Sequence, residues 1–448
     1  MRLTGSAPYL KLRKLCSDFH TRVALPVYNR TYAPIIEKIS RLKWGKLILT
    51  MLVACIINCL FIGIIGSSDF FSVELAEISG FNYILLSQMF LIAFSAALIS
   101  APFFGYLAVR KSCLFVIRLG LALTIAALIL LGIFIESLVL VWFVGLLWGI
   151  GGGAVSYGVV YGAAAEHVPR KLYPVLSTMM LASHNIVAVI LIPVLYPLIE
   201  VLGMSAVLVI LAAAIFLIAP FSTVLKDSRS YHEETIAPIA ATFSGIFKSI
   251  LKSGFFWVFA AVFVVLGFLY AQVANDVVGA LYYYDLDKLM IPFLILLNLA
   301  LVFGAFIFRK FLERCRYKFD LLILGIAFIL VLVPIWIAVP IPTSLLVEFC
   351  IVCLFLLAAD PLIVSILMDH YKPLEIAFVL SLLVLIFYFA IALDTVLDAL
   401  FLVIIGNVTI NMILVAGLAV AVLIFLLLYQ RRKVKAGEMV SRNPLWKR

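Results

Sequence analysis

Long, nearly uncharged runs of apolar residues alternate with short polar segments along most of the chain. Each run approaches about 20 residues, the length that an α-helix needs to cross the hydrocarbon core of a bilayer. Strands of a membrane barrel would instead give short segments in which apolar and polar residues alternate. For the segment 394–407 a surface helix is one interpretation. The pattern predicts twelve spanning helices, approximately at 47–67, 83–107, 114–135, 138–163, 173–196, 204–223, 254–275, 290–308, 320–340, 343–367, 374–393 and 408–429.

Composition narrows the class of protein. The chain has 448 residues, of which 66% are hydrophobic and 12% are charged. Soluble proteins carry about 25% charged residues, so these values indicate an integral membrane protein. In lipid each backbone polar group must be satisfied inside its own segment, which favours an all-α, multi-pass fold.

The positions of the basic residues predict the orientation in the membrane. Cytoplasmic loops of membrane proteins carry an excess of Lys and Arg. With a cytoplasmic N-terminus, only Lys288 of the 33 Lys and Arg residues falls outside the predicted cytoplasmic segments. We therefore expect both termini in the cytoplasm, where the net charge of +10 faces anionic lipid rather than nucleic acid. The opposite loops carry acids, namely Asp69, Glu74, Glu77, Glu136, Glu200, Asp285 and Asp287.

Two motifs recur at the ends of predicted helices. The second helix ends in FGYLAVRK at 104–111, and the eighth ends in FGAFIFRK at 303–310. The fourth and tenth helices end in acid–His pairs at 166–167 and 369–370, with a similar separation. Such a repeat predicts two six-helix halves of the same orientation, with a substrate site between them. The predicted parts are a basic cytoplasmic N-terminal segment 1–46, a first bundle 47–223, a cytoplasmic linker 224–253, a second bundle 254–430 and a basic cytoplasmic tail 431–448.

The segment 105–112, GYLAVRKS, resembles the signature loop of the major facilitator superfamily, Gly-x-Leu-Ala-Asp-Arg-x-Gly. It departs from that signature at Val109, where the family has an acid, and at Ser112, where the family has glycine. The segment 166–170 is similar to the family's acid–Pro–Arg motif. The resemblance covers essentially the whole chain and implies alternating access to a central site. The gate would involve Gly105, Arg110, Glu166, Arg170 and Asp369, with Arg170, Lys111 or Lys310 as partners for the acids.

Glycine content gives further predictions about helix packing and about the direction of transport. The glycine-rich stretch 148–161 predicts close contact of the fourth helix with a neighbour. The fifth helix contains no glycine between Tyr173 and Tyr196, whereas the family's antiporters have a fifth helix rich in glycine and proline. This difference favours uptake or facilitated exchange over efflux.

Polar groups inside a spanning helix are candidates for function. In the family that this chain resembles, the first, fourth, seventh and tenth helices line the central cavity. The candidate substrate contacts are Asn58, Tyr157, Tyr161, Asn185, Tyr270 and Gln272. The candidate proton-coupling residues are Asp360, Glu348 and His184. Each of these three has a structural alternative: a neutral acid at the kink before Pro361, a solvated acid at the cavity mouth, and a neutral imidazole bonded to a neighbouring helix.

These features predict a monomeric secondary transporter in a bacterial inner membrane, which takes up a small neutral, zwitterionic or cationic solute together with protons. Efflux of a siderophore or hydrophobic compound is one alternative. A non-transporting receptor or scaffold with the same fold is another. The five histidines form no His-Glu-x-x-His motif, and the chain has no Gly-x-Ser-x-Gly or Walker motif. We therefore expect no enzymatic activity, metal or cofactor.

Overall fold

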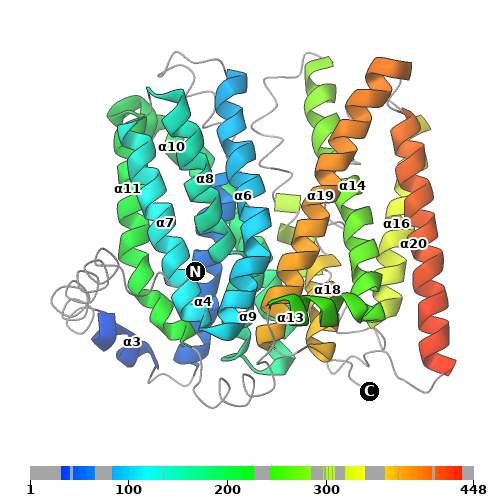
Figure 1. Cartoon of the computed structure of the whole chain (residues 1–448), viewed down its shortest axis with the longest axis horizontal. Coiled ribbons are helices and arrows are strands. Elements are labelled where there is room, and N and C mark those ends of the chain that lie inside the picture. The colour runs from blue at the N-terminus through cyan, green and yellow to red at the C-terminus, as the bar shows by residue number, and fades with distance from the viewer. Residues whose placement is uncertain are drawn as a thin grey trace.

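The computed structural model describes nine segments of the chain and a few helical residues between 296 and 307. All of the regular structure in these segments is helical (Figure 1). The described segments are 32–40, 44–65, 83–134, 136–226, 243–283, 318–338, 359–371, 373–405 and 409–435.

The first block of helices follows the chain from the short helix α3 to the 3-10 helix η4. Ser112 caps the start of α7, where its hydroxyl oxygen accepts a hydrogen bond from the Phe115 N–H at 3.1 Å. Gly203, with φ of 79°, separates α10 from α11. The elements are α3 (Ala33–Ser40), α4 (Gly45–Ile65), α6 (Tyr83–Arg110), α7 (Cys113–Ile133), α8 (Leu138–Ala154), α9 (Tyr157–Ala165), η3 (Arg170–Leu172), α10 (Tyr173–Leu202), α11 (Met204–Ile218) and η4 (Ala219–Leu225).

The second block stands beside the first in Figure 1. It begins with a short amphipathic helix, α13, which leads into the long apolar helix α14. The elements are α13 (Phe243–Lys252), α14 (Gly254–Tyr283), α16 (Lys318–Ala338), α18 (Ala359–His370), α19 (Pro373–Ile405) and α20 (Thr409–Lys435).

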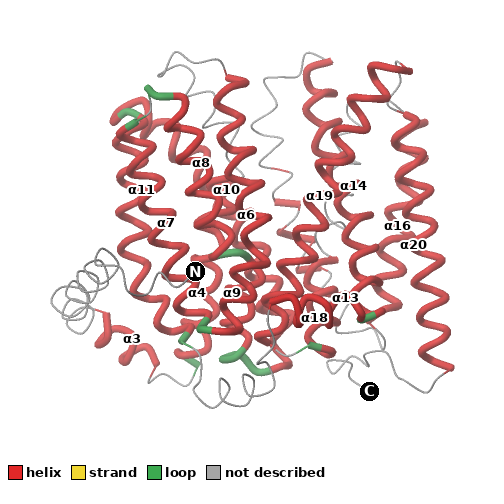
Figure 2. The backbone as a smooth tube through the Cα atoms, viewed as in Figure 1, coloured by secondary structure: helices red, strands yellow, loops and turns green. Residues whose placement is uncertain are grey.

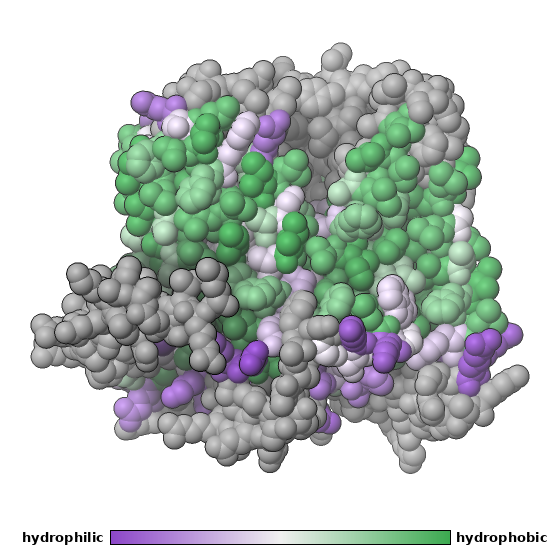
Figure 3. All heavy atoms as spheres, in the orientation of Figure 1, coloured by the Kyte–Doolittle hydropathy of each residue, from purple (hydrophilic) through white to green (hydrophobic). Residues whose placement is uncertain are grey.

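On the face that Figure 3 shows, the described surface of both blocks is mainly apolar. Large aliphatic side chains lie exposed along the helices, for example Ile99 at 73% and Val139 at 72% exposed. Seven helices in the described part are long and apolar enough to cross a membrane. An apolar belt of this extent needs lipid around it, so the protein is an integral, multi-pass membrane protein.

Basic residues gather at one end of this belt. The described Lys and Arg residues lie at the end where α4 and α14 begin and where α6 and α20 finish, which we call the basic end. Figure 3 shows hydrophilic side chains along this lower edge. At the other end of the belt, Glu136 lies just before α8 and Glu200 lies in the last turn of α10, and both are exposed.

The predicted span 138–163 is confirmed as one candidate membrane span, Leu138–Ala165. Within it, however, the helix is broken, because Ser156 takes an extended ψ of 153° and separates α8 from α9 (Figure 2). The surface helix considered for 394–407 does not form as a separate element, since α19 runs unbroken to Ile405. The predicted span 290–308 and residues 343–358 of the tenth span lie wholly or largely outside the described residues.

Helix α8 packs on α6 through glycine. A Cβ atom on Gly145 would lie 2.7 Å from the Met89 carbonyl oxygen, so the two backbones touch at this point. Gly149 and Gly153 follow at intervals of four residues, and Cβ atoms there would lie 2.0 Å from the Ala93 carbonyl oxygen and 2.1 Å from the Ser100 hydroxyl of α6. The predicted close contact of the glycine-rich stretch is confirmed, and it holds α6 against α8 over about two helical turns.

Candidate functional site

The two blocks meet near the basic end along a line of small residues. A Cβ atom on Gly105 of α6 would lie 3.0 Å from the carbonyl oxygen of Ala377 in α19. A Cβ atom on Gly158 of α9 would lie 2.7 Å from the same oxygen and 3.0 Å from the Ser381 hydroxyl. We call Gly105, Gly158, Ala377 and Ser381 the seam.

The seam brings three backbones together without leaving a buried hydroxyl unsatisfied. Ser381 is buried, and its hydroxyl donates a hydrogen bond to the Ala377 carbonyl oxygen at 2.7 Å. Because that bond lies within α19, Ser381 meets α6 and α9 through close packing and not through a hydrogen bond between helices. A contact of this kind can separate without breaking that bond.

Away from the basic end, α6 and α19 meet through large side chains and no longer through their backbones. The rings of Phe94 and Tyr388 meet edge to face there, with centroids 4.2 Å apart. Two aromatic side chains occupy the space between the helices at this level, whereas Gly105 places no side chain there. The helices α6 and α19 therefore approach most closely at the seam and diverge from it towards the opposite end.

Three predicted substrate contacts lie on the first-block side of the seam. The hydroxyls of Tyr157 and Ser177 lie 2.7 Å apart and share a hydrogen bond between α9 and α10. Asn58 of α4 donates to the Met180 carbonyl oxygen at 3.0 Å. Since Ser177 and Met180 lie one turn apart on α10, Asn58 and Tyr157 bind the same turn of that helix from two sides.

These residues differ in exposure. Tyr161 is fully buried and donates to the Tyr173 carbonyl oxygen at 3.2 Å, and Asn58 is also fully buried. Tyr157 is only partly buried, and its ring lies 5.7 Å from that of Tyr161. In the conformation described, Tyr157 is the one of the three that a solute could reach with least rearrangement. Their roles as substrate contacts stay predictions.

Tyr270 is the predicted substrate contact that the structure describes in the second block. It lies partly buried on α14, with its ring 5.9 Å from Phe387 of α19. Its position on α14 is thus tied to α19, the same helix that forms the seam.

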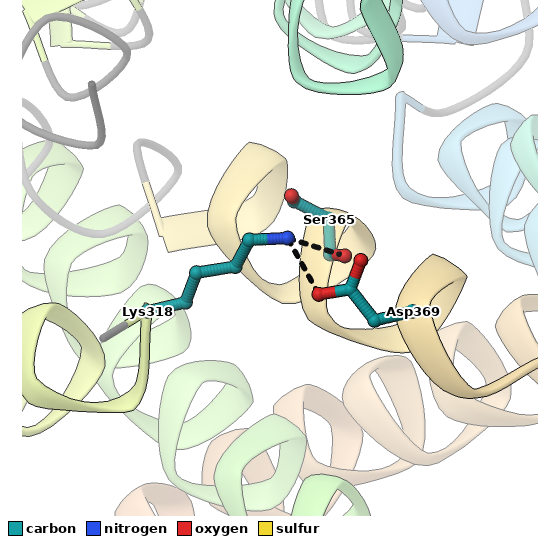
Figure 4. Close-up of polar contacts among 3 residues, drawn as sticks. All are labelled: Lys318, Ser365 and Asp369. Atoms are coloured by element: carbon teal, nitrogen blue, oxygen red, sulfur yellow. Dashed lines mark hydrogen bonds and ion pairs between the residues drawn. The ribbon is translucent and has the colours of Figure 1, made fainter. Parts of the chain in front are cut away.

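An ion pair that the sequence did not predict holds the second block at the basic end (Figure 4). The Lys318 ammonium lies 2.6 Å from Oδ2 of Asp369 and donates a second hydrogen bond to the Ser365 carbonyl oxygen at 3.2 Å. Lys318 begins α16 and is 2% exposed, whereas Asp369 near the end of α18 is 37% exposed. The pair therefore joins α16 to α18 within one block.

The electrostatics of this pair follow from its burial. Lys318 precedes the predicted span 320–340, and burial lowers its pKa from the ordinary lysine value. The Asp369 carboxylate opposes this shift, because it favours the charged ammonium through both attraction and a hydrogen bond. The expected partners of Asp369 were Arg170, Lys111 or Lys310, so finding Lys318 corrects that prediction. The sequence signal was available, since Lys318 stands directly before an apolar run.

The remaining gate candidates also lie at the basic end. Arg110 ends α6 and donates to the Tyr106 hydroxyl at 3.0 Å. Glu166 follows α9 and is partly buried, and Arg170 is exposed at the start of η3. Beside Asp369, the His370 ring stacks on Phe255 of α14 at 4.2 Å.

Several predicted residues lie beyond what the structure describes. Glu348 falls outside the described residues. The backbones at His184, Asn185, Gln272 and Asp360 are helical, but their side chains are not described. Among the described residues, no group of three or more His, Cys, Asp or Glu side chains could hold a metal ion.

Comparison with known proteins adds no further assignment. No protein-family model and no curated protein matches the chain. The chemistry of the site therefore rests on the residues themselves.

Proposed function

We propose that the protein is a secondary transporter of the major facilitator type, with twelve spanning helices in two six-helix halves. It moves a small organic solute by alternating access to a site between the halves. The observation that supports this most directly is the seam, where the two blocks touch through Gly105 and Gly158 and from which α6 and α19 diverge. A contact of this kind allows one end of the molecule to close while the other opens.

The charge distribution supports an orientation for this transporter. Lys and Arg in the described residues lie at the basic end, which corresponds to the cytoplasmic side of a bacterial inner membrane. The seam then closes the cytoplasmic side. In the opposite state the α6 and α9 backbones move away from α19, and a solute leaves towards the cytoplasm.

The chemistry of the predicted contacts supports a solute class. Asn58, Tyr157, Tyr161 and Tyr270 offer hydroxyl, amide and aromatic groups but no positive charge. A strongly anionic solute would need cationic partners such as Arg. Neutral, zwitterionic or cationic solutes therefore fit best, and proton-coupled uptake assigns the coupling to Asp360, Glu348 or His184.

The test begins with the purified full-length protein in detergent. Amino acids, sugars, nucleosides and siderophores are screened for a rise in melting temperature, because a ligand that binds the folded state stabilises it by mass action. A stabilising compound is then offered, as a radiolabelled probe, to proteoliposomes with and without an imposed pH gradient. We expect accumulation that depends on the gradient and is lost in Asp360→Asn.

Other results would exclude the proposal or redirect it. Binding without any flux across the bilayer would indicate a receptor or scaffold. Flux driven only outwards from the cytoplasmic side would indicate efflux. Tyr157→Phe serves as a matched variant, because it keeps the ring and removes only the hydroxyl shared with Ser177.

A further inference from the structure

Helix α13, which leads into α14, has one apolar side and one charged side. Ile250 is buried, and Phe247 and Leu251 are partly buried against the core of the protein. Lys248 and Lys252 are exposed. Because residues four apart on a helix lie on the same face, the two lysines extend from one side of α13 while its apolar side packs on the protein.

Hydrogen bonds hold α13 at the start of α14. Only Ser253 separates the two helices, and the Phe256 N–H donates to its carbonyl oxygen at 3.1 Å. The Trp257 indole N–H, on the first turn of α14, donates to the Leu251 carbonyl oxygen at 2.7 Å. In Figure 1, α13 lies across the direction of α14 near the lower ends of the helices. An amphipathic helix in this orientation is typical of a membrane surface.

Two tryptophan residues mark the level of the lipid surface at the basic end. Trp is enriched where a spanning helix crosses the boundary between hydrocarbon and headgroups. Trp257 is 52% exposed, and Trp44, directly before α4, is 59% exposed. Both α4 and α14 begin at the basic end, so one exposed indole stands near this end in each block. Since Trp257 is bonded to α13, we infer that α13 lies at the level of the lipid headgroups.

The charged side of α13 suits an anion at this level. Helix α13 contains two lysines and no acid. Its counterpart α3, which precedes the first spanning helix of the other block, carries Glu37 directly before Lys38, and both are exposed. Within the described part of the chain, neither Lys248 nor Lys252 pairs with an acid. Anionic lipid headgroups supply negative charge at a cytoplasmic membrane surface, and lysines near that surface bind them favourably.

We propose that α13 is a binding site for an anionic phospholipid, in which Lys248 and Lys252 contact the phosphate of one headgroup and Trp257 packs against the adjoining glycerol region. The two lysines lie about 6 Å apart along the helix, so both ammonium groups can reach one phosphate. The bound lipid joins α13 to α14, which also contacts the end of α18 where the Phe255 ring stacks on His370. Lipid at this site therefore stabilises the basic end of the second block. This inference does not depend on the transport of a solute.

The first test measures stabilisation by lipid in the full-length protein, purified in a neutral detergent. Phosphatidylglycerol is titrated in, with phosphatidylcholine as the zwitterionic comparison, and the melting temperature is recorded. We expect phosphatidylglycerol to raise the melting temperature more than phosphatidylcholine does. Lys248→Gln and Lys252→Gln should each raise the lipid concentration needed for half of this rise about fivefold, the factor for one lysine at an anionic surface. Lys38→Gln, on the exposed side of α3, should leave that concentration unchanged.

Three results of this titration would overturn the inference. An equal loss in Lys38→Gln would indicate a general attraction of basic residues to anionic lipid. An equal rise with inorganic phosphate alone would indicate a site for a free anion. No difference between the two lipids in the wild type would exclude a preference for anionic lipid. The double variant Lys248→Arg with Lys252→Arg should keep the preference, because it keeps both charges.

The second test locates the bound lipid by fluorescence. Phosphatidylglycerol that carries bromine on its acyl chains near the headgroup quenches an indole only at short range. We expect it to quench the wild type more than brominated phosphatidylcholine does. This excess should disappear in Trp257→Phe and in the double variant Lys248→Gln with Lys252→Gln. An excess that persists in either variant would place the anionic lipid elsewhere on the protein and overturn the inference.

Discussion

Helix α6 makes two close contacts that use glycine in different ways. Against α8, the backbones come together over about two turns within one block, at Gly145, Gly149 and Gly153. Against α19, only Gly105 does so, and an aromatic pair keeps the helices apart further along. The contact with α8 is tight at each of its three glycines, whereas the contact with α19 is tight only near the basic end. We call the contact of α6 with α8 at Gly145, Gly149 and Gly153 the fixed joint, and we call the seam, where α6 and α9 meet α19, the separable joint.

The largest effect on stability is expected at the fixed joint. A valine at Gly149 would place its Cβ against the Ala93 carbonyl oxygen and 2.7 Å from the Ala96 Cβ, and neither helix can yield without losing its other glycine contacts. We expect Gly149→Val to lower the free energy of unfolding by about 3 kcal/mol, as overpacking of a tight core does. The measurement is the melting temperature in detergent.

A matched glycine provides the control for this substitution. Gly417 on α20 is exposed and has no atom within 4 Å of its Cβ position. Gly417→Val should leave the melting temperature close to that of the wild type. Equal losses in the two variants would mean that the fixed joint does not depend on glycine.

The apolar pattern was sufficient for much of the fold, for a physical reason. A bilayer demands continuous apolar runs, so the predicted span 114–135 closely matches α7 and the predicted start of the seventh span matches α14 at Gly254. Close packing was also predictable where glycine replaces side chains in a helix, as at 148–161.

Features that depend on a partner were not predictable from the pattern. The extended backbone at Ser156 interrupts a run that remains apolar in composition. Asp394 falls in the segment for which a surface helix was considered, yet it is fully buried within the unbroken helix α19. Lys318 counted as one more cytoplasmic charge until the fold placed it beside Asp369. For Asp394 and Lys318 the local composition did not reveal that the side chain is buried, because burial depends on segments far apart in the sequence.

The ion pair within the second block should give an intermediate effect. Asp369→Asn leaves the buried Lys318 ammonium without its counter-charge. Loss of one partner of a fully buried pair costs about 3–5 kcal/mol, and we expect about 2 kcal/mol here because Asp369 is 37% exposed. The double variant Lys318→Met with Asp369→Leu should recover much of this loss in melting temperature. No recovery would indicate that the pair acts through other contacts of Asp369.

The smallest effect on stability and the largest on conformation are expected at the separable joint. A methyl group at Gly158 would lie 2.7 Å from the Ala377 carbonyl oxygen, so α9 and α19 must move apart to admit it. Because the blocks can separate there, Gly158→Ala should cost less than about 1 kcal/mol, below the usual cost of overpacking.

The opening is measured at a thiol placed inside the seam. Ser381→Cys puts a thiol at a position that is 1% exposed, and mass spectrometry follows its modification by a water-soluble maleimide. The rate should rise when Gly158→Ala is added. It should not rise with Gly254→Ala, since no atom lies within 4 Å of that Cβ position. An unchanged rate together with a large loss of stability in Gly158→Ala would show that the seam is a second fixed joint, and the contrast between the two contacts of α6 would not hold.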